Sequence, residues 1–144
     1  MARPRCGRVS TCSATPNSSR WGGATRTTSR SLTVVATVVS RHAGPDGATH
    51  LVLDAGSKVL GSDRPAWAPG YGRIAGQPEA VIVALSEHHA TVSWPADEPV
   101  PALGSLLDVI PNHVCLVLNL VDEVVAVTAS GSERWPVAAR GKNG

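Results

Sequence analysis

Short runs of apolar residues, separated by turn residues, dominate the chain from residue 32 onward. The first run, residues 32–40 (LTVVATVVS), is rich in β-branched side chains, which favour strands. A second run at 49–54 follows a turn-like segment at 42–47 (HAGPDG), so the two runs predict a β-hairpin. Later runs predict five further strands, at residues 81–85, 91–94, 105–110, 124–128 and 135–138.

Two segments depart from this strand pattern. Residues 61–76 are rich in Gly and Pro and predict a long connection, and loops of this length are usually functional or disordered. In residues 112–120 the leucines alternate as in a strand, whereas the valines fit a helical face, so helix and strand both stay open. Seven or so short strands with turns between them predict an all-β fold, a small antiparallel β-barrel or sandwich.

Residues 1–31 have no apolar periodicity and consist largely of Arg, Ser, Thr and Gly. Such a segment cannot bury enough surface to offset the entropy lost on ordering. We therefore expect a disordered basic tail at 1–31 and one folded domain at 32–141. Two alternatives for the tail stay open: translated sequence upstream of the true start, and an organelle transit peptide, which is also Arg- and Ser-rich.

Composition narrows the classes of function. The chain has 144 residues, no Phe and one Tyr, so one domain with a core of Val, Leu, Ala and Ile is expected. Residues 1–31 hold six arginines and no acid, and the remainder carries 7 basic against 11 acidic residues, a net charge of −4. The basic character lies in the tail, so a nucleic-acid partner is not expected. No apolar run approaches the roughly 20 residues of a membrane span.

His113 and Cys115 are the residues most suited to binding a metal ion. Imidazole nitrogen and thiolate sulfur are both ligands for Zn²⁺. Structural zinc sites normally have four protein ligands, but the other cysteines, Cys6 and Cys12, both lie in the predicted tail. An incomplete ligand set suits a catalytic metal, whose open positions take water or substrate. The alternative is a buried polar pair at a strand end, satisfied by backbone groups.

Three cysteines, an odd number, provide no disulfide framework. A thiol that serves as a ligand indicates a reducing compartment, so we expect a cytoplasmic location.

Five segments follow one another along the chain: residues 53–58 (LDAGSK), 70–73 (GYGR), 86–90 (SEHHA), 109–115 (VIPNHVC) and 135–141 (WPVAARG). Together they resemble one family, the C-terminal domain of D-serine dehydratase and D-threonine aldolase-like enzymes, which are fold-type III pyridoxal-phosphate proteins. The resemblance covers residues 32–141.

The resemblance implies a β-domain that packs beside an alanine-racemase-type barrel carrying the cofactor lysine. It implies that His113 and Cys115 hold a divalent metal, with the cysteine favouring zinc. In the complete enzyme the metal would act as a Lewis acid on the β-hydroxyl of a β-hydroxy D-amino acid, and pyridoxal phosphate would act as the electron sink. Glu87 and His89 become candidate catalytic residues; a solvated corner between two strands explains them equally well.

The chain departs from the family pattern in two respects. His88 stands where the family usually has a second Glu, and neither lysine of the chain, Lys58 or Lys142, matches the cofactor lysine of the absent barrel. The resemblance therefore implies a detached or truncated lyase domain, inactive alone, whose partner is a barrel domain of the same enzyme or of a separate chain. The alternative is a non-catalytic module that docks on such a partner. Dehydratase and aldolase chemistry both stay open.

Other residues near these segments carry weaker expectations. An ion pair or a cap is expected of Asp54 and Lys58, and Tyr71 either packs in its loop or faces the barrel. A barrel-facing surface left bare would expose apolar area, so association into a homodimer is a further expectation.

Overall fold

The computed structural model describes residues 8–12, 32–44, 47–128 and 130–142, which form strands and two short helices. The elements in chain order are β1 (Arg8–Cys12), β2 (Thr33–Ala43), β3 (Thr49–Leu53), α1 (Ser57–Leu60), β4 (Gly72–Ile74), β5 (Gln77–Leu85), β6 (Ala90–Trp94), β7 (Leu106–Pro111), α2 (Val114–Leu120), β8 (Glu123–Thr128) and β9 (Gly131–Pro136). The fold class predicted from the sequence is confirmed.

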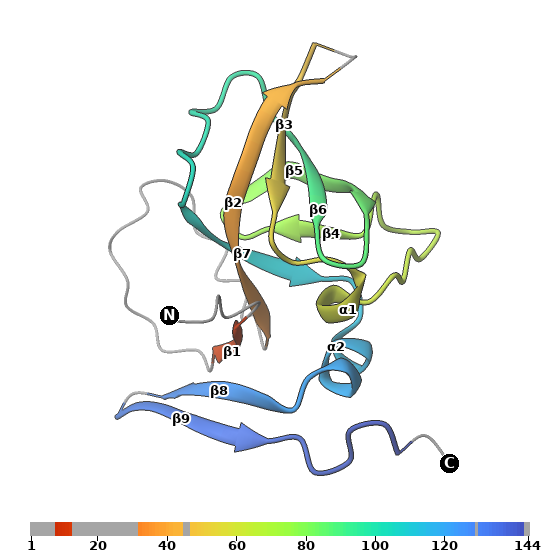
Figure 1. Ribbon diagram of the computed structural model, residues 1–144, viewed down its shortest axis with the longest axis vertical. Coiled ribbons are helices and arrows are strands. Elements are labelled where there is room, and N and C mark those ends of the chain that lie inside the picture. Colours follow the sequence, from red (N-terminus) through yellow and green to blue (C-terminus); the bar gives the residue numbers. More distant parts are fainter. Residues whose placement is uncertain (1–7, 13–31, 45–46, 129, 143–144) are drawn as a thin grey trace.

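Six of these strands close into an antiparallel barrel, in the order β2-β3-β6-β5-β4-β7 and back to β2 (Figure 1). Closure depends on β2, which at 11 residues is long enough to pair with two partners. Its first part, from Val34 to Thr37, pairs with β7, and its second part, from Val38 to Ala43, pairs with β3. A register shift between Val38 and Ser40 lies within the pairing with β3, just after the change of partner.

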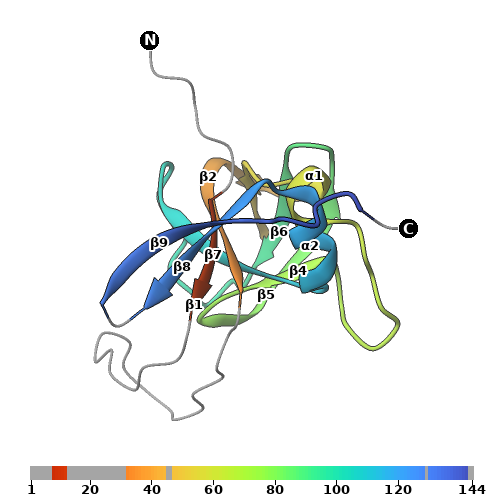
Figure 2. The same cartoon turned by 90° about the horizontal axis from the view of Figure 1, so that it is seen from below.

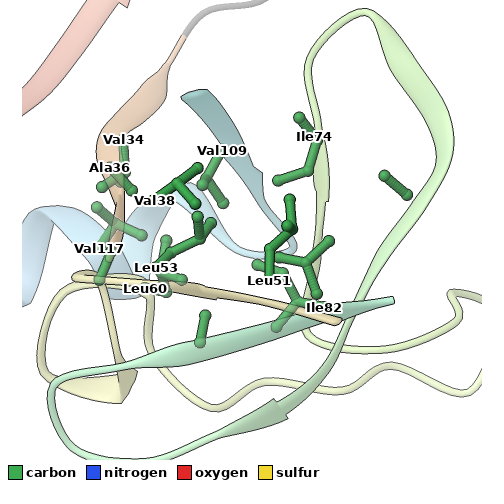
Figure 3. Packing of buried hydrophobic residues seen from close by; sticks show 14 of the residues in the cluster. Val34, Ala36, Val38, Leu51, Leu53, Leu60, Ile74, Ile82, Val109 and Val117 are labelled. Carbon is green, nitrogen blue, oxygen red and sulfur yellow. The ribbon is translucent and has the colours of Figure 1, made fainter. Parts of the chain in front are cut away.

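The barrel interior is filled by the alternate, inward-facing side chains of these strands. Along β2 the residues Val34, Ala36 and Val38 are buried, and along β3 the residues Leu51 and Leu53 are fully buried. Figure 3 shows these side chains converging with those of the other strands. The aliphatic core expected from the composition is therefore confirmed, and Trp94 is the one aromatic side chain in the buried core of the described residues.

The two helices lie side by side against this core (Figures 1 and 2). Leu60 of α1 and Val117 of α2 both belong to the core cluster. The sequence left helix and strand open for residues 112–120, and the segment forms a helix because one buried valine, Val117, anchors it while its other apolar residues lie half-buried. None of the helices in the described part of the chain is long and apolar enough to cross a membrane.

A smaller set of strands extends the sheet beyond the barrel. β1 pairs antiparallel with β2 and parallel with β8, and β8 forms an antiparallel hairpin with β9 (Figure 1). Residues 8–12 were expected within a disordered tail, but they form a strand because β2 and β8 each offer β1 a strand edge. The rest of the predicted tail lies outside the described residues.

Most predicted strands are present, and the differences are local. The strand expected at 135–138 lies earlier, at Gly131–Pro136, where residues of β9 pair with β8. The predicted long connection at 61–76 contains β4, a strand of only three residues. So short a strand gives no periodic signal in the sequence, and its two neighbours in the barrel create it.

Candidate metal centre

His113 and Cys115 lie where β7 gives way to α2. β7 ends at Pro111, and His113 is still extended (φ −140°, ψ 105°) immediately before the first helical residue. Cys115 lies in the first turn of α2. Both side chains are exposed, so the alternative of a buried polar pair at a strand end is wrong.

The two side chains line one surface depression of about 510 Å³. Its polar lining residues are Asp63, His113, Cys115 and Asn119. Its apolar lining residues are Leu116, Leu118, Val137 and Ala139. The depression therefore places an imidazole, a thiol and a carboxylate beside an apolar wall.

Asp63 contacts the imidazole directly, with 2.5 Å between its Oδ2 and Nδ1 of His113. The neighbouring Asn112 holds the loop that carries Asp63. Its side-chain amide donates to the backbone oxygens of Asp63 and Gly70, both at 3.0 Å. Asn112 and His113 thus fasten the loop to the end of β7 at three points.

The C-terminal segment forms the far wall of the depression. Val137 N–H donates to the backbone oxygen of Asp122 at 2.9 Å, and Gly141 N–H donates to the side-chain oxygen of Asn119 at 2.8 Å. Arg140 forms an ion pair with Asp122. These contacts hold residues 137–141 against α2 and the residues that follow it.

The donor set of the depression is partial. Within the described residues no three His, Cys, Asp or Glu side chains form a ready cluster for a metal ion. His113 and Cys115 have the donor types that zinc prefers, and the His113 side chain is 50% exposed. These two residues have the donor types of a metal site, but two donors do not make up the four protein ligands of a structural zinc site.

Glu87 and His89 occupy a different corner, the tight turn between β5 and β6. Ser86 N–H donates to the backbone oxygen of His89 at 2.9 Å. Glu87 forms an ion pair with Lys58 at 2.7 Å, and this hydrogen bond and charge lower the pKa of Glu87. Neither Glu87 nor His89 is among the residues that line the depression.

The remaining expected contacts are made differently. Asp54 accepts a hydrogen bond from the backbone N–H of Thr37 in β2 at 2.6 Å, and α1 has no side-chain cap, so the expected cap is not formed. Lys58 pairs with Glu87. Tyr71 is half-buried against the core, and the guanidinium of Arg64 lies over its ring, 5.6 Å from the ring centroid.

The chain matches the family model described as "Putative serine dehydratase domain" over residues 31–127. It is also 62% identical, over 113 residues, to the uncharacterized protein Rv1414 of Mycobacterium tuberculosis (strain ATCC 25618 / H37Rv), covering 78% of this chain and 85% of that protein. This chain belongs to the serine dehydratase domain family. The resemblance inferred from the five sequence segments is thereby confirmed.

Larger enzymes contain a domain similar to this serine dehydratase domain. D-threonine aldolase of Arthrobacter sp is 35% identical over 112 residues, covering 77% of this chain and 27% of the aldolase. D-threonine aldolase from Filomicrobium marinum superimposes with a TM-score of 0.64 at 30% identity, over 80% of this chain and 29% of that one. D-threo-3-hydroxyaspartate dehydratase from Delftia sp. HT23 superimposes with a TM-score of 0.62 at 26% identity, over 75% of this chain and 32% of that one. The domain spans about a third of these enzymes or less.

Two solved variants of D-threo-3-hydroxyaspartate dehydratase alter a His and a Cys that are two positions apart. One structure is a Cys→Ala variant in a metal-free form, and another is a His→Ala variant whose altered residue precedes that cysteine by two positions. The spacing equals that of His113 and Cys115 in this serine dehydratase domain.

Sequence reasoning did not single out Asp63, Asn112 or Asn119 as parts of the site. The available signal for Asp63 was its place in the long Gly- and Pro-rich connection, a loop type that often carries function. Asn119 lies within α2 and has no sequence signal of its own, because its role depends on the C-terminal segment folding back onto that helix.

Proposed function

We propose that this chain is the metal-site domain of a pyridoxal-phosphate-dependent lyase that acts on β-hydroxy D-amino acids, and that it works with a barrel domain. Membership of the serine dehydratase domain family supports the class of enzyme. The named relatives act on D-threonine and D-threo-3-hydroxyaspartate, which are both β-hydroxy D-amino acids. Because the domain spans 27–32% of those enzymes, the rest of the machinery belongs to another domain.

The observation that carries the proposal is the shared depression of His113 and Cys115. These two residues would hold Zn²⁺ or another divalent cation, through imidazole nitrogen and thiolate sulfur. A cation bound there supplies Lewis-acid polarisation of a substrate hydroxyl. The apolar wall formed by Leu116, Leu118 and Val137 limits water on one side, while Asp63 holds the imidazole in place.

A partner is required because the depression is open. The side chains of His113 and Asp63 are 50% and 48% exposed, so an occupant that touched this chain alone would stay largely in water. Trp67, in the same loop as Asp63, is 77% exposed. A large exposed aromatic side chain in the loop that carries Asp63 is typical of a surface that another domain covers.

Pyridoxal phosphate does not fit the described residues. Its covalent attachment needs a lysine amine, and the amine of Lys58 is paired with Glu87 in the corner between β5 and β6. Lys142 lies in the exposed C-terminal segment, and neither lysine lines the depression. We therefore assign the cofactor to the barrel domain, with Glu87 and His89 as candidate catalytic groups that would face it.

A non-catalytic docking module is the second candidate. It is favoured by the mycobacterial relatives, in which the matched region makes up 85% of the protein and leaves only 15% outside the match. A remainder of that size has no room for a barrel domain of about 250 residues.

Zinc binding tests the ligand assignment. We expect any zinc that the purified chain binds, measured by elemental analysis and isothermal titration calorimetry, to be lost in His113→Ala and in Cys115→Ala. His88→Ala, which alters a histidine outside the depression, is the matched control and should bind as the wild type does. Full stoichiometry and unchanged affinity in both ligand variants would refute the assignment.

Turnover separates the two candidate functions. The chain alone should show no lyase activity and no absorbance near 420 nm, and turnover of D-serine or D-threonine by the chain alone would contradict the proposal. The chain is then mixed with a barrel polypeptide that carries a cofactor lysine and is encoded in the same genome. Restored turnover supports the lyase, whereas docking without turnover supports the binding module.

A further inference from the structure

Asp63 belongs to none of the five family-like segments, yet it makes the closest polar contact of the candidate metal centre. We propose that Asp63 is a positioning residue: it fixes His113 in the tautomer that carries its proton on Nδ1, which leaves Nε2 free to bind a divalent cation. This inference rests on the proposed function of the domain. Its test is nevertheless designed to give an answer about Asp63 even if that function fails.

The donor and acceptor roles at this contact follow from the chemistry of the two groups. An ionised carboxylate can only accept hydrogen bonds, whereas a neutral imidazole has one donor nitrogen and one acceptor nitrogen. Oδ2 of Asp63 lies 2.5 Å from Nδ1 of His113, so Nδ1 must be the donor. The lone pair of the neutral ring therefore lies on Nε2, the nitrogen that a metal needs.

The position of Asp63 is fixed independently of its contact with His113. Asn112 holds the backbone oxygens of Asp63 and Gly70 with one amide group, so it pins the loop at two points seven residues apart. Gly70 is itself confined: it has φ +67°, and a Cβ there would lie 2.3 Å from the backbone oxygen of Ile82. A loop held in this way presents its carboxylate in one place.

The cation next to Asp63 in sequence is engaged elsewhere. Arg64, the next residue, places its guanidinium over the ring of Tyr71. A carboxylate bonded to the second nitrogen of a metal-binding histidine is a recurrent arrangement, because it orients the ring and makes the ligand nitrogen more basic. Altering such a partner typically weakens metal binding 10–100-fold.

The first test uses the metal-free full-length chain. ¹⁵N chemical shifts of His113 are recorded at about pH 9, where histidine side chains are ordinarily neutral. We expect the Nδ1–H tautomer in the wild type and in Asp63→Asn, whose carbonyl oxygen still accepts a hydrogen bond. We expect a shift toward the Nε2–H tautomer in Asp63→Ala. Asp97→Ala, which removes an exposed carboxylate outside the depression, is the control and should resemble the wild type.

The second test measures zinc affinity of the same variants by calorimetry. Asp63→Ala should raise the dissociation constant about 10–100-fold, Asp63→Asn should raise it less, and Asp97→Ala should leave it unchanged. The inference is overturned if His113 of the wild type is the Nε2–H tautomer, or if Asp63→Ala leaves the tautomer of His113 unchanged. An unchanged zinc affinity in Asp63→Ala also overturns it. If His113→Ala binds zinc as the wild type does, the metal-centre proposal fails, and the tautomer measurement alone then decides whether Asp63 positions the ring.

Discussion

Replacing Gly56 with Ala should destabilise the domain through a steric clash alone. Gly56 precedes α1 and has φ −108°, which any residue adopts, so the substitution introduces no backbone strain. A Cβ there would lie 2.4 Å from the backbone oxygen of Ser86 and 2.5 Å from that of Glu87, and ordinary contact begins at 3.4 Å. The corner between β5 and β6 would therefore have to retreat by about 1 Å.

This retreat allows the cost to be estimated. Two hydrogen bonds join α1 to the corner, from Ser57 N–H to Ser86 at 2.9 Å and from Lys58 N–H to Glu87 at 3.1 Å. A shift of about 1 Å breaks both, at about 1 kcal/mol each, and overpacking adds about 1–3 kcal/mol. Alanine also lowers the conformational entropy of the unfolded chain, and this stabilises the folded state by about 0.4–1 kcal/mol. The free energy of unfolding should fall by about 2–4.6 kcal/mol.

Urea unfolding followed by far-UV circular dichroism measures this change. With a slope of about 2 kcal/mol/M, the midpoint should fall by roughly 1–2 M. Gly104→Ala is the matched control, because Gly104 has φ +82° and a Cβ there would meet nothing within 4 Å. An alanine there has the strain of a left-handed backbone conformation, about 1–2 kcal/mol, but no clash. The lower conformational entropy of the unfolded chain partly offsets this cost. If Gly56→Ala costs no more than Gly104→Ala, the clash argument is wrong.

Two further variants test the barrel core and the corner that carries Glu87. Leu53→Ala empties a fully buried site in β3 and should lower the free energy of unfolding by about 2–5 kcal/mol in the same urea assay, and a loss under 1 kcal/mol would contradict the observed packing. Lys58→Met should raise the pKa of Glu87 toward 4.5, measured by carboxyl ¹³C NMR, because Lys58 is the main cause of its lowered pKa. A carboxyl pKa lowered by folding contributes stability above pH 4.5 that is lost as pH falls through the folded-state pKa, so the wild type should lose more stability than Lys58→Met below pH 4.5.

The strands could be predicted where burial on one face leaves a clear alternation. In β2 the buried residues Val34, Ala36 and Val38 repeat every second position, and the hairpin to β3 follows from the turn between them. The path of β4 could not be predicted, because its three residues are strand only through pairing with β5 and β7. α1 has four residues and no side-chain cap, so its backbone contacts with the β5–β6 corner take the place of a sequence signal.

In the candidate site, too, some residues could be predicted from the sequence and others depend on contacts made only in the folded chain. His113 and Cys115 could be selected by ligand chemistry and spacing, since both lie in one continuous segment. Asp63 could not, because it is 50 residues away in sequence and reaches His113 only when the loop folds against the end of β7. Glu87 and His89, which the family resemblance nominated, lie outside the depression, and their part in catalysis remains a prediction.

Because β1 lies inside the sheet, the position at which translation starts affects the folded structure. β1 lies between β2 and β8, so it is the hydrogen-bonded link that joins the β8–β9 hairpin to the barrel. A polypeptide that began translation after residue 12 would keep the barrel and the depression but would expose two bare strand edges. Free edges of this kind are templates for aggregation. For recombinant expression, the choice of start site would therefore decide whether the product resists aggregation.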